Sequence, residues 1–192
     1  MQKWDACHFS SAINCNHCKL MKKIILIFLF LTSSISSALA CDVKIIPFGS
    51  EKEKIKLNPL PENFPDQFQG ESIIIPIQEI CKNDKELIGT MVSFLFIDNQ
   101  LLQISLIRAN MNDAQLMNFA MKQYGEFPLP SGIKKENFRG NYLWEQGNEN
   151  INYVSINIQD GSAEFIEITN DLYLEKLQQY NQKVGEWLDS QK

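Results

Sequence analysis

Hydrophobic and polar residues alternate over two stretches of the chain, and each stretch predicts a β-hairpin. The first runs from Met91 to Arg108, with Asp98–Gln100 as a three-residue loop. One face of this hairpin would be built from alternate apolar residues, namely Val92, Phe94, Phe96, Leu102, Ile104 and Leu106. The opposite face is also partly apolar, so we expect another element to cover part of it.

The second hairpin is predicted from two strands, Ile151–Ile158 and Ala163–Thr169, around a loop at Gln159–Gly161. The glycine suits a tight turn because it adopts a positive φ without strain. With this loop, the core face would hold the apolar residues Val154, Ile156, Ile158, Ile166 and Ile168. A short strand over Tyr142–Glu145 precedes this hairpin.

Two segments instead show the helical period. The first helix would be capped by Asn112 or Asp113 and stopped by Gly125. Its apolar side would consist of Ala114, Met117, Met121 and Tyr124. The last helix is expected from about Asp171 to Leu188, with an apolar stripe of Tyr173, Leu177, Tyr180, Val184 and Trp187.

Upstream of the first hairpin, short strands are expected at Val43–Phe48 and Ser72–Ile77, on either side of an irregular, proline-rich arm at residues 49–70. Pro47 and Pro76 place these strands at edges or strand ends. The order of elements predicts an α+β fold. Its antiparallel sheet would be built from two β-hairpins plus the N-terminal strands, with two helices packed on one face in the order ββα-ββα.

The segment at residues 21–40 has the pattern of a cleaved signal peptide. Two lysines follow Met21, the apolar run Ile24–Leu31 comes next, and Ala38-Leu39-Ala40 matches a small-x-small cleavage site. The apolar run is too short for a spanning helix. Residues 1–20 contain Cys15 and Cys18 in a C-x-x-C pattern, which zinc could bind. We interpret these first residues as upstream sequence read as coding, and we place translation initiation at Met21.

Residues 41–192 are expected to form a single exported domain without histidine. They carry 14 Lys and Arg residues against 22 Asp and Glu residues, a formal charge of −8. A negative domain repels nucleic acid and anionic membrane surfaces, so the expected partner is a basic protein of the cell envelope. Without histidine, the domain has no Ser-His or Cys-His dyad and no histidine-rich metal site, and no cofactor or metal is expected.

Cys41 and Cys81 are the two cysteines of this domain, and Cys41 could be modified in either of two ways. In an oxidising compartment they would form a disulfide. Alternatively, Ala38-Leu39-Ala40-Cys41 resembles a bacterial lipobox with its leucine one place late, and Cys41 would then be lipidated and tethered to the membrane. We expect the disulfide and a periplasmic location.

Three groups of residues are candidates for function. Ser131 and Lys134 fit the S-x-x-K motif of penicillin-binding enzymes, although the prolines nearby favour a loop. Glu164 and Glu167 lie on one strand but point to opposite faces, so they are not a catalytic pair by themselves. Tyr142, Trp144 and Tyr153 would form either an exposed recognition patch or part of the core.

These observations favour a non-catalytic protein-binding module, such as an immunity or inhibitor protein or an envelope accessory protein. A small envelope hydrolase that uses carboxylates or the Ser131 and Lys134 pair is the enzymatic alternative. A small-ligand carrier is the third possibility, and it would require an apolar pocket between sheet and helices.

Overall fold

The computed structural model describes residues 41–56, 64–109 and 113–192. The predicted signal peptide at 21–40 and residues 1–20 lie outside the described residues. The described residues all belong to one compact unit of the chain. Within them, no helix is long and apolar enough to cross a membrane.

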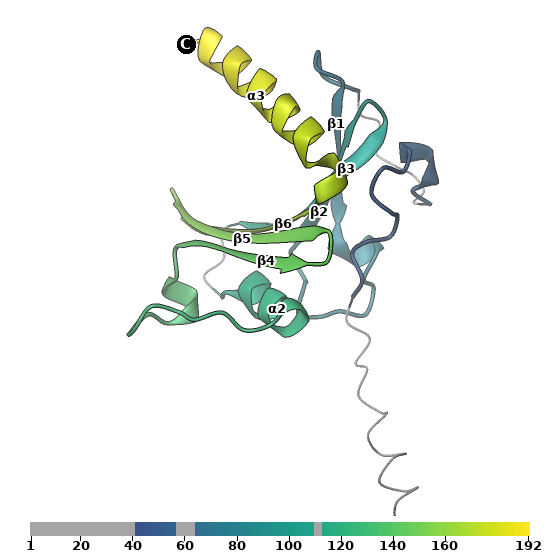
Figure 1. Cartoon of the computed structure of the whole chain (residues 1–192). Coiled ribbons are helices and arrows are strands. Elements are labelled where there is room, and N and C mark those ends of the chain that lie inside the picture. Colours follow the sequence, from purple (N-terminus) through teal and green to yellow (C-terminus); the bar gives the residue numbers. More distant parts are fainter. Residues whose placement is uncertain (1–40, 57–63, 110–112) are drawn as a thin grey trace, which may run out of the picture. The chain divides into compact units, whose positions relative to one another are not determined.

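The core of the fold is a six-stranded antiparallel sheet with the order β1-β2-β3-β6-β5-β4 (Figure 1). Its strands are β1 (Gly70–Pro76), β2 (Met91–Ile97), β3 (Gln100–Ala109), β4 (Gly140–Gln146), β5 (Glu149–Ile158) and β6 (Gly161–Asn170). Two three-stranded meanders, β1-β2-β3 and β4-β5-β6, are joined by the pairing of β3 with β6. The α+β class and the antiparallel sheet are therefore confirmed.

Each meander is followed by one helix. Helix α2 (Gln115–Tyr124) follows β3, and α3 (Leu174–Ser190) follows β6. Short 3-10 turns are η1 (Lys52–Lys54), η2 (Ile77–Glu79), η3 (Lys135–Asn137) and η4 (Asp171–Tyr173). The predicted order ββα-ββα is corrected to βββα-βββα, because β1 and β4 complete the two meanders.

The two helices lie on opposite faces of the sheet, not on one face as predicted (Figure 1). Leu116 and Met117 of α2 belong to the main core, together with Ile166 and Ile168 of β6. Leu177 of α3 instead packs in a small second cluster with Ile97 and Leu102. The apolar second face of the first hairpin explains the difference, because α3 supplies the cover that this face requires.

The predicted apolar stripe of α3 is mostly not buried. Leu177 is its only buried residue, whereas Trp187 is exposed. Figure 1 shows the helix leaving the sheet toward its C-terminal end. The second half of α3 therefore adds little to the core.

The first hairpin closes through a two-residue turn rather than the predicted three-residue loop. Asp98 and Asn99 both have positive φ, and Ile97 pairs with Gln100. The shorter turn places Leu101, not Leu102, opposite Phe96, and the register then shifts between Phe96 and Leu95. The remaining predicted core residues of this face are all buried, so the bulge restores the alternation after the shorter turn.

The loop of the second hairpin was also predicted one residue too long, and here no bulge compensates for the shorter turn. Its turn is Gln159–Asp160, and Ile158 pairs with Gly161. A shift of one residue turns every side chain of a strand to the other face. Ile151 and Tyr153 thus join the core beside Ile168 and Ile166, and Ile156, predicted as core, is exposed.

The N-terminal segment packs on the core without forming the predicted strand at Val43–Phe48. Val43 and Ile46 are buried in the main cluster. A disulfide joins Cys41 to Cys81, with a Cα–Cα distance of 5.5 Å, and so ties this segment to the loop after β1. Pro76 is the last residue of the edge strand β1, in agreement with the expectation.

Replacing Cys41 and Cys81 together by serine is expected to lower the free energy of unfolding. The lost cross-link spans 40 residues, which corresponds to about 4 kcal/mol in the chain-entropy model. Urea unfolding of residues 41–192 with and without reductant measures this difference. If reduction leaves the unfolding midpoint of the wild-type domain unchanged, the cross-link does not stabilise the fold.

Candidate functional site

A buried carboxylate of the central strand β6 holds the start of helix α2. Glu164 is only 4% exposed. Its Oε2 and Oε1 accept hydrogen bonds from the backbone N–H groups of Leu116 and Met117, each at 3.2 Å. The hydroxyl of Tyr153 donates a third bond to Oε1, at 2.7 Å. A negative group at a helix N-terminus satisfies free amides and complements the helix dipole, so Glu164 is a structural anchor.

The pKa of Tyr153 is strongly raised. Burial is the main cause, and the neighbouring charge of Glu164 and its hydrogen bond add to it. The hydroxyl therefore stays protonated and remains a donor to Glu164 over the whole physiological pH range.

A buried arginine lies beside this carboxylate. Arg108 of β3 is opposite Glu164 in the strand register and is also 4% exposed. Its guanidinium pairs with Asp113 at 2.6 Å and donates to the carbonyl of Ile88. The hydrogen bond to Arg108 lowers the pKa of Asp113. These contacts compensate the buried charge of Arg108 and hold Asp113 close to the start of α2.

The three aromatic residues proposed as a recognition patch all pack around Phe127 on the α2 face. Tyr153 is 1% and Trp144 is 8% exposed, and Tyr142 is half-buried. Phe127 stacks on Tyr142 at 4.4 Å, and the indole N–H of Trp144 donates to the carbonyl of Gly125 at 2.9 Å. Their rings therefore build core structure, and these residues do not form an exposed patch.

Ser131 and Lys134 lie in an exposed turn between α2 and η3. No hydrogen bond joins the two side chains, and neither lies on a helix. A lysine that activates a serine must be held within hydrogen-bond reach of it, in a site that excludes water. The turn provides neither condition.

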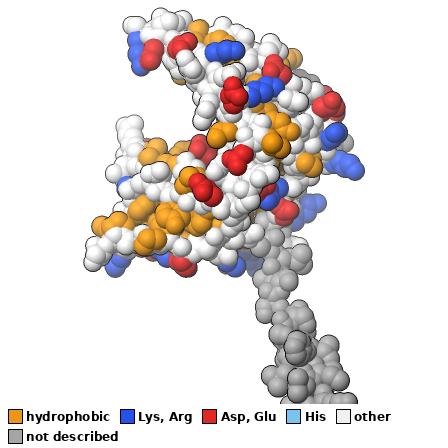
Figure 2. Space-filling view, viewed as in Figure 1, with side chains coloured by type: hydrophobic (Ala, Val, Ile, Leu, Met, Phe, Trp, Pro, Cys, Tyr) orange, Lys and Arg blue, Asp and Glu red, His pale blue; other side chains and the backbone are white. Residues whose placement is uncertain are grey.

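The hollow of interest lies on the other face of the sheet, between the first turns of α3 and strands β3, β6, β5 and β4. Figure 2 shows it as a recess with acidic side chains on its walls. Its volume is about 540 Å³. We call it the amide groove because six of its lining residues carry side-chain amides: Gln103, Asn141, Asn150, Asn152, Gln178 and Asn181.

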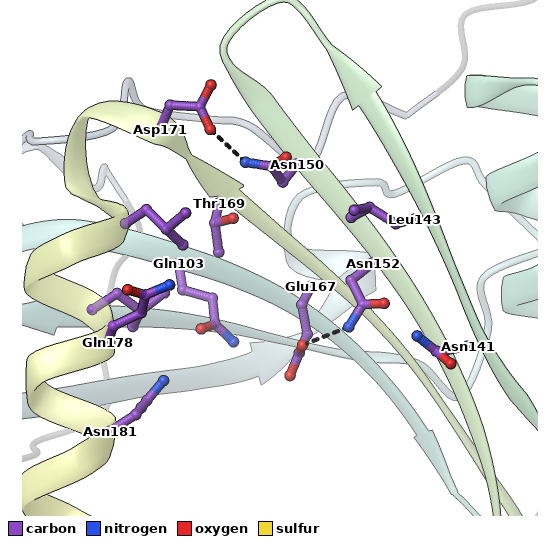
Figure 3. Close-up of a pocket in the computed structure, with 12 residues that line it drawn as sticks. Gln103, Asn141, Leu143, Asn150, Asn152, Glu167, Thr169, Asp171, Gln178 and Asn181 are labelled. Carbon is purple, nitrogen blue, oxygen red and sulfur yellow. Dashed lines mark hydrogen bonds between the residues drawn. The ribbon is translucent and has the colours of Figure 1, made fainter.

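The amides point into the groove from both sides (Figure 3). Asn152 donates to Glu167 at 3.3 Å, and Asn150 donates to Asp171 at 2.6 Å. Among the described residues, the side chains of Asn141, Gln178 and Asn181 have no hydrogen-bond partner, so their donors and acceptors are available to a bound molecule.

The charge of the groove has one sign. Glu167 and Asp171 are its charged lining residues, and no Lys, Arg or His is among those that line it. Leu143, Leu174 and Leu177 provide the apolar part of its surface. A groove of this composition can offer hydrogen bonds to a polypeptide backbone and attract a cationic side chain.

Glu164 and Glu167 have separate roles on the two faces. Glu164 is covered by α2, whereas Glu167 opens into the groove. In the described part of the chain, no cluster of three or more Cys, His, Asp or Glu side chains could hold a metal ion.

No family model matches the chain, and neither a curated protein nor a solved structure matches it. The fold and the groove geometry are therefore the observations from which function can be argued.

The amide groove was not predicted from the sequence. Asn150 and Asn152 are two residues apart on β5, and Glu167 and Thr169 are two apart on β6, which is the period of one strand face. The β6 part of this signal was on the correct face, opposite Ile166 and Ile168. The β5 part was placed on the core face, because the loop of the second hairpin was predicted one residue too long.

Replacing Tyr153 by phenylalanine is expected to lower the free energy of unfolding by about 1.5–3 kcal/mol at neutral pH, since a hydrogen bond to a buried charged group is lost. The wild-type domain should also lose stability as the pH rises above about 10, where the unfolded tyrosine ionises but the folded one does not. The variant should show a shallower loss there.

Urea unfolding at pH 7 and between pH 9 and 11 measures both effects. Phe127 to leucine is a suitable comparison, because it alters the same aromatic cluster without removing a titrating group. Equal alkaline slopes for wild type and Tyr153→Phe would contradict the assigned role of the hydroxyl.

Proposed function

We propose that residues 41–192 act outside the cytoplasm as a non-catalytic protein-binding module, which holds a basic segment of another envelope protein in the amide groove. The observation that carries this proposal is the composition of the groove. It combines unpaired amides and two carboxylates with no cation among its lining residues. Complementary charge favours a Lys- or Arg-bearing partner and speeds association.

Two features support export to an oxidising compartment. The pattern at residues 21–40 predicts a cleaved signal peptide. The disulfide between Cys41 and Cys81 is typical of proteins that work in such a compartment. A cysteine held in a disulfide has no thiol for a lipid, so this pairing favours a periplasmic protein over a lipoprotein anchored through Cys41.

The shape and polarity of the groove favour a macromolecule over a small ligand. Pockets for small molecules are mostly apolar and enclose their ligand. The amide groove is open, and nine of its twelve lining residues carry polar side chains. An enzymatic role has less support, because Ser131 and Lys134 are exposed in a turn and Glu164 is bound to α2.

Among protein-binding modules, an immunity or inhibitor protein agrees best with the negative charge of the domain. Toxins and wall-degrading enzymes with basic surfaces would be attracted over some distance to a domain of charge −8. An envelope assembly accessory would use the same groove and the same chemistry.

The test is capture of a partner by oxidised residues 41–192 from an envelope extract of the native organism, at low and at high salt. One stoichiometric basic protein released by high salt is the expected result. Glu167→Lys should weaken its binding about tenfold or more, since an attractive charge becomes a repulsive one.

Glu126→Lys is the matched control. It makes the same charge change at an exposed residue after α2, away from the groove. If both variants lose binding equally, general charge rather than the groove attracts the partner. If no protein is captured at either salt, the binding module is not supported.

A further inference from the structure

Strand β4 forms an open edge of the sheet. It pairs with β5 on one side and is the last strand in the sheet order. In the part of the chain that the structure describes, no other segment hydrogen-bonds to the backbone of its outer side. An unpaired edge presents a row of free N–H and C=O groups to any extended chain.

The outward-facing backbone groups belong to Asn141, Leu143 and Glu145. Gln146 and Glu149 flank the two-residue turn at 147–148 and pair with each other. Such a pair exchanges hydrogen bonds, and pairs along an antiparallel ladder alternate between bonded and non-bonded. Residues 140, 142, 144 and 146 therefore bond to β5, and residues 141, 143 and 145 face outward. All three of these are exposed.

This edge lacks the usual protection against pairing. Exposed edges are normally blunted by lysine, proline, a bulge or a covering segment. Strand β4 contains no lysine or proline, and its register with β5 shows no shift. Its one charged residue is Glu145, which attracts cations.

The edge is continuous with the amide groove. Asn141 and Leu143 line the groove with their side chains, and Leu143 is 48% exposed. The same two residues present their main-chain groups at the edge. A chain lying along β4 would thus bond to the edge and place alternate side chains over the groove face.

We propose that the partner segment binds in an extended conformation as a seventh strand along β4, with its basic side chains directed to the groove face. This proposal rests on the proposed function of the groove. Strand addition gains affinity from main-chain hydrogen bonds and specificity from every second side chain. Glu145 at the edge supplies a site within reach of Lys or Arg, whereas Glu167 on β6 and Asp171 after β6 lie two strands further in and add attraction over a longer distance.

Charge favours a basic partner over a second copy of this chain. Pairing of β4 with β4 of another copy would bring two copies of Glu145 to one edge and would join two domains of charge −8. Like charges close together in a ladder are destabilising. A strand that carries lysine is instead attracted by Glu145 and by the negative charge of the domain.

The test uses residues 41–192 labelled for NMR and a capped octapeptide of alternating lysine and threonine as the probe. The backbone amides of Leu143 and Glu145 should exchange rapidly with solvent in the free protein and become protected when the peptide is added. The side-chain amides of Asn152 and Gln178 report separately on occupation of the groove. A glutamate–threonine octapeptide is the control and should change neither set.

Two substitutions at Leu143 distinguish the contribution of its backbone N–H from that of its side chain. Leu143→Pro removes the outward N–H while sparing the bonds to β5, and an edge strand tolerates proline with its N–H side facing solvent. It should weaken peptide binding about tenfold or more. Leu143→Thr removes the leucine but keeps the N–H, and it should lose far less affinity. If the proline variant misfolds, protection of the Leu143 and Glu145 amides from exchange when the peptide is added to the wild-type protein still tests the proposal.

The outcomes distinguish this proposal from the groove function. Shifts of the groove amides without protection of Leu143 and Glu145 would overturn strand addition and leave groove binding in place. No change at either set at millimolar peptide would overturn strand addition and also count against the groove. Protected edge amides in the free protein, together with a dimeric mass, would overturn it in favour of self-pairing.

Discussion

The hydrogen bonds of Glu164 are the contacts on which most of the second half of the fold depends. Its carboxylate joins three elements, because it sits on β6, accepts from Tyr153 on β5 and caps the first amides of α2. Without this group, the amides that begin α2 would be buried unpaired, at a cost of about 1–3 kcal/mol each. The register of β5 against β6 is also fixed, since a shift of β5 by one residue would turn Tyr153 to the other face and away from Glu164.

With α2 anchored on one face, the polar part of the other face is left without a helix packed directly on it. With α2 held against one face, the core is completed by the aromatic cluster around Phe127 and Trp144. On the second face, α3 covers only the apolar end at Ile97 and Leu102. The polar remainder of that face becomes the amide groove, with β4 at its border.

The candidate sites show which properties follow from the local sequence pattern and which depend on tertiary packing. From the sequence, Tyr142, Trp144 and Tyr153 could form either a patch or part of the core, and packing against Phe127 decided for the core. Nothing in the sequence around Glu164 distinguishes it from the other carboxylates of the domain. Its role depends on Leu116 and Met117, which are almost 50 residues away in the chain and which no local pattern links to it.

The sequence by itself determined the α+β class, the approximate positions of the strands from β1 onward and of both helices, and the pairing partners Cys41 and Cys81. These follow from the period of apolar residues, from turn-forming residues and from there being two cysteines in the domain. The tertiary structure alone decided which face each strand buries and that the helices cover opposite faces. A change of one residue in a turn reverses a whole strand, and only the summed packing of Ile151, Tyr153, Ile166 and Ile168 against α2 selects the register. The groove is a consequence of that selection, so it became visible only with the folded chain.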